Sequence, residues 1–309
     1  MAWTGTVNGI INPTSVSTIN VSGIASIMGV ESSSVEKGYI YCGSGTGLLL
    51  DCDEYDPDSW TSKTNIPSPA RQHSSSSDIS DKGYVYGGHN GTAQILDTDE
   101  YDPDTWANKT NTPSPARNVA AASTISSKGY LYCGFNGTAR LQNCDEYTSD
   151  SWANKTNTPS PARSSLSAST ISDKGYIYCG YTGSYLQDTD EYDPDTWANK
   201  TNCPTPARTA QTASTISSKG YIYCGYGSGY LQDCDEYTPD TWASKTSMPA
   251  PGRDSAASST ISDKGYVYCG YESTTPYYLK DTDEYDPDTW TSKTDAPTPS
   301  RKDHAASTI

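Results

Sequence analysis

Residues 264–270 read Lys-Gly-Tyr-Val-Tyr-Cys-Gly, and near copies of this stretch recur along the 309-residue chain. Each copy opens on a Lys-Gly pair followed by Tyr, at Lys37, Lys82, Lys128, Lys174, Lys219 and Lys264. Six units of about 45 residues suit the blades of a β-propeller better than a helical solenoid. Ser, Thr, Gly and Pro are too dense for helices, and no apolar period of about 3.6 residues is present.

One copy followed in full predicts four short strands. Residues 256–261 are small or β-branched, which suits the crowded innermost strand of a blade. A Lys-Gly turn leads into residues 266–269, an alternating strand with two Tyr side chains on one face. A hairpin loop then leads to a third strand ending at residues 281–285. Residues 286–289 (Asp-Pro-Asp-Thr) predict a type I turn, and residues 290–294 form the outer strand.

Each unit also carries a Trp on its predicted outer strand and an Arg that closes a Pro-rich turn. The tryptophans are Trp60, Trp106, Trp152, Trp197, Trp242 and Trp290. The arginines are Arg71, Arg117, Arg163, Arg208, Arg253 and Arg301. We interpret both sets as structural. Guanidinium geometry favours a tie from each Arg to a carboxylate or carbonyl of a neighbouring blade, rather than a basic ring at one mouth of the propeller.

The order of these elements resembles the Kelch motif: Arg, a strand of small residues, Gly-Tyr-x-Tyr-x-Gly, Glu-Tyr-Asp-Pro-x-x-Trp and Pro. The resemblance covers residues 37–309. It implies an all-β, six-bladed propeller with four antiparallel strands per blade. One departure is at the double glycine of the family, which only Gly87 and Gly88 keep. The other five copies have Cys-Gly, which still places a small side chain there.

The C-terminus predicts how the ring closes. Residues 305–309 repeat the innermost strand, whereas residues 30–36, before the first copy, match that strand poorly. We therefore expect the C-terminal strand to complete the first blade. This divides the chain into an N-terminal arm, residues 1–36, and a propeller, residues 37–309. Residues 1–30 would lie outside the ring and anchor the protein to other structural proteins.

Composition limits the partners. The formal net charge is -16, which argues against nucleic acid and anionic membrane surfaces. No stretch is long and apolar enough for membrane insertion. Only 33% of residues are apolar, yet 25 Tyr and 7 Trp are present, and a sheet protein can build its core from such rings.

Nine cysteines are present, so at least one is unpaired or intermolecular. Copies one, three and five carry a second Cys where the even copies carry Thr. Candidate disulfides across one hairpin are Cys42–Cys52, Cys133–Cys144 and Cys224–Cys234. The alternative is that each Cys is simply a small buried residue. Cys179, Cys203 and Cys269 show no partner in the sequence, and we expect them to be reduced.

The sequence predicts no enzyme and no cofactor. Some oxidases carry a Kelch propeller with a copper site, but such a site needs convergent imidazoles, and His73, His89 and His304 form no motif. Nucleophile-elbow, His-Glu-x-x-His and phosphate-loop patterns are also missing. The carboxylates of residues 97–104 invite a calcium interpretation but lack the glycine-centred spacing of an EF-hand. A solvated acidic blade face that keeps sheet edges apart is the alternative.

The loops between the second and third strands vary more than the strands and are rich in Tyr, Ser, Gly and Asn. That composition is typical of recognition loops, although hairpin turns need Gly and Asn in any case. The candidate binding residues at the loop tips are His89, Asn90, Phe135, Asn136, Tyr181, Tyr226, Tyr277 and Tyr278.

These observations favour a non-catalytic binding or structural protein. Our first hypothesis is a surface component of a virus or phage particle, serving decoration, fibre or host attachment. Its loops would bind a host surface glycan or protein. The protein itself would be located on the virion or at an extracellular surface. The alternative is an intracellular, cytoplasmic Kelch adaptor that binds a protein partner. A propeller-based oxidase or glycan-active enzyme stands third.

Overall fold

The computed structural model describes residues 6–7, 10–11, 26–27, 30–31, 36–275 and 277–309. The chain divides into two units, Met1–Val35 and Glu36–Ile309. In the first unit β1 (Thr6–Val7) pairs with β2 (Ile10–Ile11), and β3 (Ser26–Ile27) pairs with β4 (Val30–Glu31). The predicted arm otherwise falls largely outside the described residues. Within the described part of the chain, no helix is long and apolar enough to cross a membrane.

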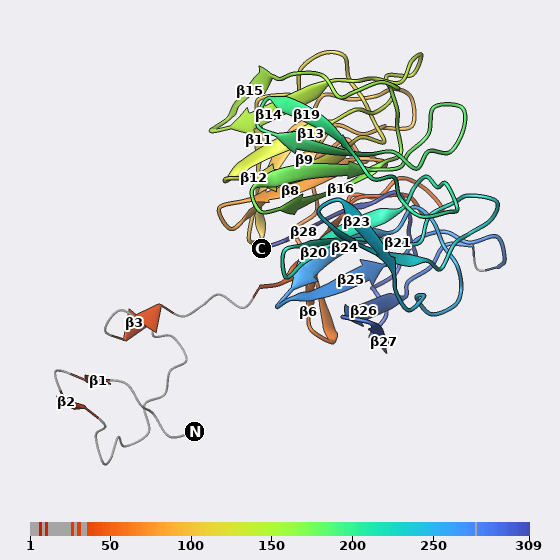
Figure 1. Ribbon diagram of the computed structural model, residues 1–309. Helices are drawn as coiled ribbons and strands as arrows, with labels where there is room; N and C mark the ends of the chain where they lie inside the picture. Colours follow the sequence, from red (N-terminus) through yellow and green to blue (C-terminus); the bar gives the residue numbers. More distant parts are fainter. Residues whose placement is uncertain (1–5, 8–9, 12–25, 28–29, 32–35, 276) are drawn as a thin grey trace. The chain divides into compact units, whose positions relative to one another are not determined.

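The second unit is a six-bladed propeller of four-stranded antiparallel sheets (Figure 1). Blade 1 contains β28 (Ala305–Thr308), β5 (Gly38–Tyr41), β6 (Cys52–Asp56) and β7 (Ser59–Lys63). Blade 2 contains β8 (Ser75–Ile79), β9 (Lys82–Tyr86), β10 (Thr98–Asp102) and β11 (Thr105–Lys109). Blade 3 contains β12 (Ala121–Ile125), β13 (Lys128–Tyr132), β14 (Cys144–Thr148) and β15 (Ser151–Asn154).

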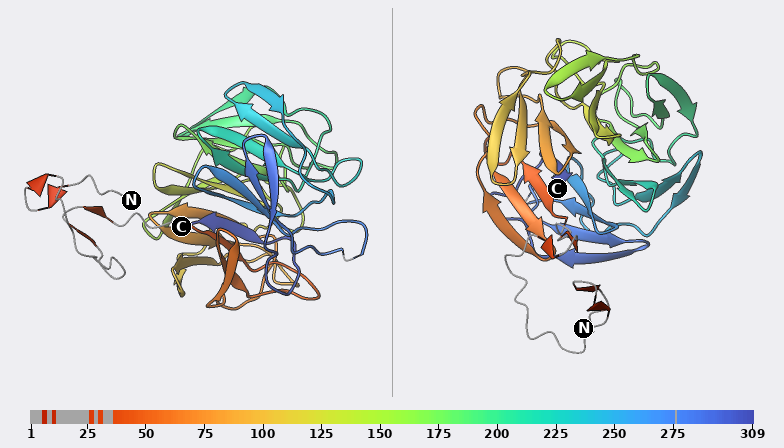
Figure 2. Two further views of the ribbon diagram at one scale, coloured as in Figure 1. Left: turned by 90° about the horizontal axis from the view of Figure 1, so that it is seen from below. Right: turned by 90° about the vertical axis from the view of Figure 1, so that its left-hand side faces the viewer.

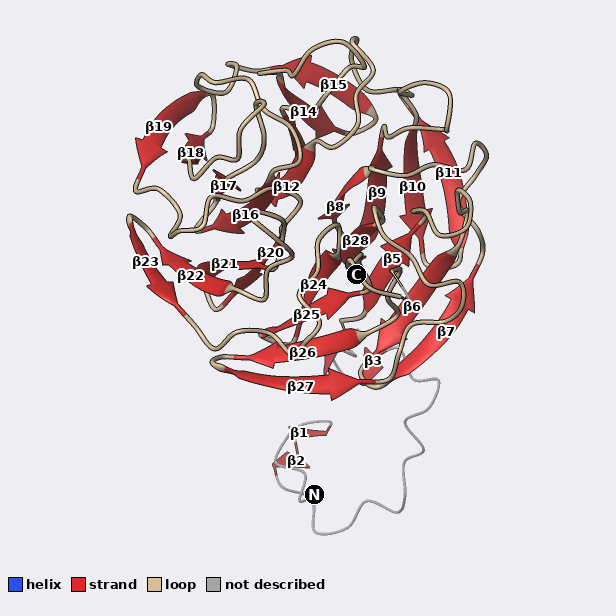
Figure 3. Ribbon diagram, turned by 90° about the vertical axis from the view of Figure 1, so that its right-hand side faces the viewer, coloured by secondary structure: helices blue, strands red, loops and turns tan. Residues whose placement is uncertain are grey.

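The remaining blades repeat this order. Blade 4 contains β16 (Ser167–Ile171), β17 (Lys174–Tyr178), β18 (Thr189–Asp193) and β19 (Thr196–Lys200). Blade 5 contains β20 (Thr212–Ile216), β21 (Lys219–Tyr223), β22 (Cys234–Thr238) and β23 (Thr241–Ser244). Blade 6 contains β24 (Ala257–Ile261), β25 (Lys264–Tyr268), β26 (Thr282–Asp286) and β27 (Thr289–Lys293). Figure 3 shows the first strand of each blade toward the centre and the fourth at the rim.

The C-terminal strand closes the ring, as the sequence predicted. Strand β28 pairs antiparallel with β5, with Ala305 opposite Tyr41 and Thr308 opposite Gly38. Lys37 and Ile309 exchange backbone hydrogen bonds of 2.8 and 3.0 Å just beyond this pairing. Figure 2 shows the C-terminus near the centre of the ring, beside the orange strands of blade 1. The last residues of the chain therefore form part of the first blade.

The Lys-Gly-Tyr repeat has a packing explanation. Gly220 is the second residue of strand β21 in blade 5, and a Cβ built there would collide with the hydroxyl of Tyr178 in blade 4. That hydroxyl lies 2.8 Å from Ser169 Oγ, and both atoms are buried. The same contact joins every adjacent pair of blades: Tyr41–Gly83, Tyr86–Gly129, Tyr132–Gly175, Tyr178–Gly220, Tyr223–Gly265 and Tyr268–Gly38. The glycine is required because the preceding blade occupies the space where a side chain would stand.

The core lies between blades and is largely aromatic. Between blades 5 and 6, buried Tyr221 and Tyr223 pack against Tyr285, with ring centroids 5.3 and 5.8 Å apart. Trp290 lies edge-on to Tyr223 at 5.6 Å, and its Nε1 donates a 2.8 Å hydrogen bond to the carbonyl of Thr246 in blade 5. Each blade therefore completes the core of its neighbour, as expected of a chain with many Tyr and few aliphatic residues.

Six buried ion pairs also join the blades. Each of the repeated arginines is at most 2% exposed. The carbonyl of Arg208 accepts a hydrogen bond from Gly180 in blade 4, while its guanidinium lies 2.7 Å from Asp235 in blade 5. The other pairs are Arg71–Asp99, Arg117–Asp145, Arg163–Asp190, Arg253–Asp283 and Arg301–Asp53. Removal of one partner would leave an uncompensated buried charge.

The turn between the third and fourth strands differs from the predicted type I. Asp288, its third residue, has a φ of 70°, which a type I turn does not allow and a type II turn requires. Asp tolerates this left-handed region better than most residues. Its Oδ1 also accepts a 2.8 Å hydrogen bond from the backbone N–H of Thr246 in blade 5. A contact with the neighbouring blade therefore accompanies the altered turn.

The contact between tyrosine and glycine gives a first prediction. Gly220→Ala should lower the free energy of unfolding by about 1–3 kcal/mol, because the added methyl group overpacks a rigid buried site. Adding Tyr178→Phe removes the obstructing hydroxyl and should recover part of that loss. Urea unfolding of the two single variants and the double variant measures this coupling.

Gly47→Ala is the matched control, because a Cβ at Gly47 meets nothing within 4 Å. Equal stability of Gly220→Ala and the wild type would contradict this packing account. The account would also be contradicted if Gly220→Ala lowered the free energy of unfolding by the same amount with and without Tyr178→Phe.

Candidate binding surface

The loops between second and third strands are anchored at two positions each. In blade 4, Tyr181 exchanges backbone hydrogen bonds of 2.8 and 3.1 Å with Ser164, which follows the buried Arg163. Tyr181 also forms a β-bridge to Tyr185 on the return side of the loop. Blades 5 and 6 repeat the arrangement at Tyr226 and Tyr230 and at Tyr271 and Tyr278. The scaffold therefore fixes both positions, and the long loops extend from one face of the ring (right in Figure 1).

Both anchored positions are tyrosine in blades 4, 5 and 6, and the rings contact one another from blade to blade. We name these six residues, together with Tyr277, which stacks on Tyr271, the tyrosine band: Tyr181, Tyr185, Tyr226, Tyr230, Tyr271, Tyr277 and Tyr278. Ring centroids are separated by 5.7 Å (Tyr181–Tyr185), 5.9 Å (Tyr185–Tyr226), 5.1 Å (Tyr226–Tyr230), 5.8 Å (Tyr230–Tyr271), 6.2 Å (Tyr271–Tyr277) and 5.6 Å (Tyr271–Tyr278). These spacings are those of favourable aromatic pairs.

A cation lies at each end of the band. The guanidinium carbon of Arg140, from blade 3, is 4.6 Å from the centroid of the Tyr181 ring. The Lys302 ammonium is 4.3 Å from the Tyr271 centroid and 6.0 Å from that of Tyr278. All three distances suit cation–π attraction, which stabilises the rings at the two ends of the band.

The band is open to solvent at two points. Tyr185 is 39% exposed and Tyr277 is 46% exposed, the highest values among large apolar side chains in the described residues. The other five tyrosines are half-buried. Exposed rings packed against half-buried ones form a surface with apolar faces and polar hydroxyl edges.

Four of the candidate loop residues, Tyr181, Tyr226, Tyr277 and Tyr278, belong to the band. Asn90 does not: its Oδ1 accepts hydrogen bonds of 3.0 and 2.9 Å from the N–H groups of Thr92 and Ala93 and so shapes its own turn.

The remaining candidates also lie outside the band. Asn136 repeats the role of Asn90 toward residues 138 and 139. His89 accepts a 3.0 Å bond from Gly91 N–H, and Phe135 bridges to Arg140.

Five contributors to this surface are not among the residues predicted from the sequence: Tyr185, Tyr230, Tyr271, Arg140 and Lys302. The sequence does contain a signal for the three tyrosines. In each of three consecutive copies, a second Tyr lies four to seven residues after the first. Contact between one blade's second Tyr and the next blade's first Tyr could not be deduced from spacing along the chain.

A titratable carboxyl lies beside the centre of the band. Burial raises the pKa of the Asp254 carboxyl, which lies close to Tyr230, to about 6. At pH 7 this carboxyl is therefore still mostly ionised, and it loses its negative charge as the pH falls below about 6. Burial likewise raises the pKa of the Tyr230 hydroxyl, so the hydroxyl stays neutral and able to donate a hydrogen bond.

Two unlike cavities open among the inner strands of the ring. One opening has a volume of about 510 Å³ and is lined by Ser, Thr and Ala side chains, with the carboxylates of Glu36, Asp78, Asp81 and Asp263. The other opening, of about 120 Å³, includes His73 and His304 among its lining residues. His73 Nε2 lies 3.0 Å from Asp303 Oδ1. Burial, with the positive charge of Arg301, lowers the pKa of His304 to about 3.

The residues considered for metal and disulfide chemistry have other contacts. Within the region considered for calcium, Asp99 pairs with Arg71, and Asp104 Oδ1 accepts a 2.8 Å bond from Thr64 N–H. Among the described residues, no group of three or more His, Cys, Asp or Glu is placed to hold a metal ion. All nine cysteines lie in the described residues, where each is a buried free thiol. Cross-linking of the three hairpin pairs stays a prediction.

Comparisons with known proteins bear on the fold. The solved structure described as "Structure of YjhT" matches with a TM-score of 0.69 and 13% sequence identity, over 79% of this chain and 91% of that one. In all, 331 chains of solved structures match. No protein-family model and no curated protein sequence matches the chain. At such low identity, the structural similarity supports a propeller fold. It gives no information on what the loops bind.

His304 gives a prediction for pH dependence. Its pKa is about 3 in the folded protein and 6.5 in the unfolded chain, so only the unfolded chain binds this proton between those values. Acidification from about pH 7 to about pH 4 should therefore remove about 3 kcal/mol of stability through this side chain. Urea unfolding at both pH values measures the loss.

The variant His304→Gln should lack that part of the loss. It copies blade 5, where Gln211 lines the same opening. Equal pH dependence in variant and wild type would contradict a neutral buried His304.

Proposed function

We propose that this chain is a non-catalytic binding protein that recognises a neutral carbohydrate chain through the tyrosine band. The observation that carries the proposal is the row of contacting tyrosine rings across blades 4, 5 and 6, with Tyr185 and Tyr277 exposed. Sugar rings present apolar C–H faces and polar hydroxyl edges. Tyrosine matches both, because its flat face packs against C–H groups and its hydroxyl and neighbouring backbone groups form hydrogen bonds.

Charge favours a neutral ligand over an acidic polymer. The net charge of -16 repels polyanions at long range. The two cations at the band, Arg140 and Lys302, are already placed over tyrosine rings. The repetition of the tyrosine pair in successive blades suits a ligand that repeats as well, since contacts to several sugar units add through effective concentration.

We further propose that the blades are Kelch repeats and that the protein serves at the surface of a virus or phage particle. The first part rests on the Arg, Gly-Tyr-x-Tyr, Glu-Tyr-Asp-Pro and Trp order of the repeats. The second rests on composition, on near-identical blades, and on residues 1–30 as an anchor to other structural proteins. A rigid ring with varied loops is well suited to attachment, because the scaffold positions the loops without constraining their sequence.

The carbohydrate proposal is tested by binding to an array of neutral and acidic oligosaccharides. Tyr185→Ala and Tyr277→Ala should each weaken binding of the best neutral oligosaccharide roughly 10-fold, because each removes an exposed aromatic anchor. Gln94→Ala is the matched control, since Gln94 occupies the bridge position of Tyr185 in blade 2. Its affinity should equal that of the wild type.

Other outcomes would count against the proposal. Preference for acidic chains, or binding of peptides with no binding of oligosaccharides, contradicts the ligand class. Equal loss of affinity in Gln94→Ala and Tyr185→Ala would contradict the assignment of the tyrosine band as the binding surface.

The anchor proposal has its own test in the solution mass of the protein. Light scattering on a sizing column should show that the full chain associates, whereas a chain beginning at Glu36 is a folded monomer. Folded monomers in both cases would contradict self-association through residues 1–30 and would favour the adaptor alternative. Loss of folding in the shorter chain would show that the N-terminal residues contribute to a blade.

A further inference from the structure

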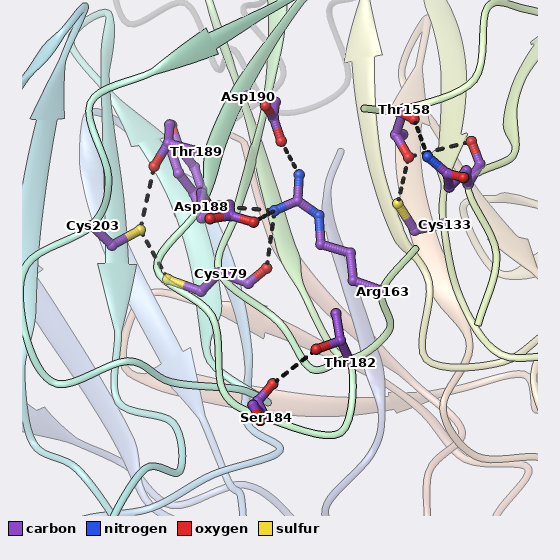
Figure 4. Close-up of polar contacts among 12 residues, drawn as sticks. Cys133, Thr158, Arg163, Cys179, Thr182, Ser184, Asp188, Thr189, Asp190 and Cys203 are labelled. Carbon is purple, nitrogen blue, oxygen red and sulfur yellow. Dashed lines mark hydrogen bonds and ion pairs between the residues drawn. The ribbon is translucent and has the colours of Figure 1, made fainter. Parts of the chain in front are cut away.

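Two buried thiols meet inside blade 4. Cys179 directly follows strand β17, and Cys203 lies in the connection that leaves strand β19. Their Sγ atoms are 2.8 Å apart, although the sequence offered neither residue a partner (Figure 4). Cys179 is 0% exposed and Cys203 is 2% exposed. Cys203 Sγ also lies 3.4 Å from Thr189 Oγ1, so the pair is enclosed by protein atoms.

The distance between the sulfurs is too short for ordinary packing. Even carbon atoms, which are smaller, make their best contact at about 3.5–4.0 Å. A disulfide has an S–S length of about 2.05 Å. The two sulfur atoms therefore require only a small further approach to reach bonding distance.

The other blades show that this meeting is particular to blade 4. The position of Cys203, defined by one shared backbone hydrogen bond, is occupied in blades 1, 2, 3, 5 and 6 by Ile66, Thr112, Thr158, Met248 and Ala296. In blade 3, Cys133 Sγ lies 3.3 Å from Thr158 Oγ1 (Figure 4). Blade 4 thus replaces a hydroxyl by a thiol at a place where a cysteine already faces it.

We propose that Cys179 and Cys203 form a disulfide that fastens the connection from blade 4 to blade 5. The bond closes a loop between residues 24 positions apart. It also fixes the base of the loop that carries Tyr181 and Tyr185, because that loop begins directly after Cys179 and Gly180. In the described residues no third metal-ligating side chain joins the pair, so a covalent bond suits it better than a metal ion.

The reaction is thiol–disulfide exchange with a small-molecule disulfide such as oxidised glutathione. One cysteine thiolate attacks a glutathione sulfur, forming a mixed disulfide and releasing one glutathione thiolate, which takes up a proton. The second cysteine thiolate then displaces the remaining glutathione, which also becomes a thiol. In sum, two cysteine thiols lose two protons and two electrons as the S–S bond forms, and one glutathione disulfide takes up both protons and both electrons to become two thiols.

The exchange takes place during folding, or while the blade is locally open. The attacking species is the thiolate. Burial, together with the contact to Cys203, raises the pKa of the Cys179 thiol well above its ordinary value. Once the blade is closed, both thiols are also out of reach of a dissolved disulfide. We therefore expect the bond to form during folding in an oxidising medium and to resist reduction afterwards.

Tryptic mapping tests the proposal directly, because cleavage after Lys174, Lys200 and Arg208 places the two cysteines on separate peptides. Residues 175–200 contain only Cys179, and residues 201–208 contain only Cys203. The full chain is unfolded, refolded with oxidised and reduced glutathione, alkylated and digested without reductant. The expected result is a linked pair of these two peptides. Alkylation of both cysteines in the refolded protein would overturn the proposal.

A matched variant assigns the effect to this pair. Cys203→Thr reproduces the Cys133–Thr158 arrangement of blade 3 and removes the cross-link. Oxidised wild-type protein should have an unfolding equilibrium constant on the order of 100-fold lower than the reduced protein, as expected for a loop of this length. In the variant, the ratio of the unfolding equilibrium constants of reduced and oxidised protein should be at least tenfold smaller than in the wild type. A full response in Cys203→Thr would overturn the proposal, because another pair would then be responsible.

Discussion

The hydroxyl at the end of each second strand, placed against a glycine of the next blade, is the contact on which the ring depends. Tyr178 over Gly220 is one of six such contacts, and each needs two blades to exist. The aromatic clusters follow the same rule, since Tyr285 packs against Tyr221 and Tyr223 of the preceding blade. A blade alone would leave these faces in water. The ring must therefore close, and strand β28 closes it.

Because the contacts between blades are made by the strands, the strand sequences repeat and the loop sequences do not. Every copy of the strand sequence makes the same contacts with two neighbours, so a change in one copy disturbs the shared core. The loops between second and third strands need only their two anchoring bridges. They are free to carry Tyr in three blades and Ser, Leu, His, Gln, Phe or Arg in the others. Recognition can thus differ around the ring while the scaffold stays uniform.

Sequence reasoning was strong where the physical cause is local or repeated. The period, the four strands per blade and the closure by residues 305–309 followed from pattern, and the structure confirms them. It failed where the cause lies in a neighbouring blade. The φ of Asp288 accompanies a hydrogen bond to blade 5, and the contact of Tyr185 with Tyr226 crosses two blades. The contact between Cys179 and Cys203 lies within blade 4 and was missed for a different reason, because partners were sought only across one hairpin.

The claim that the tyrosine band is the recognition surface is tested most directly by a crystal structure of the protein with a bound neutral oligosaccharide. The account predicts sugar rings packed flat against Tyr185 and Tyr277, with the ligand extending across blades 4 to 6. An oligosaccharide bound in either cavity among the inner strands, or on the opposite face of the ring with no contact to either tyrosine, would contradict it.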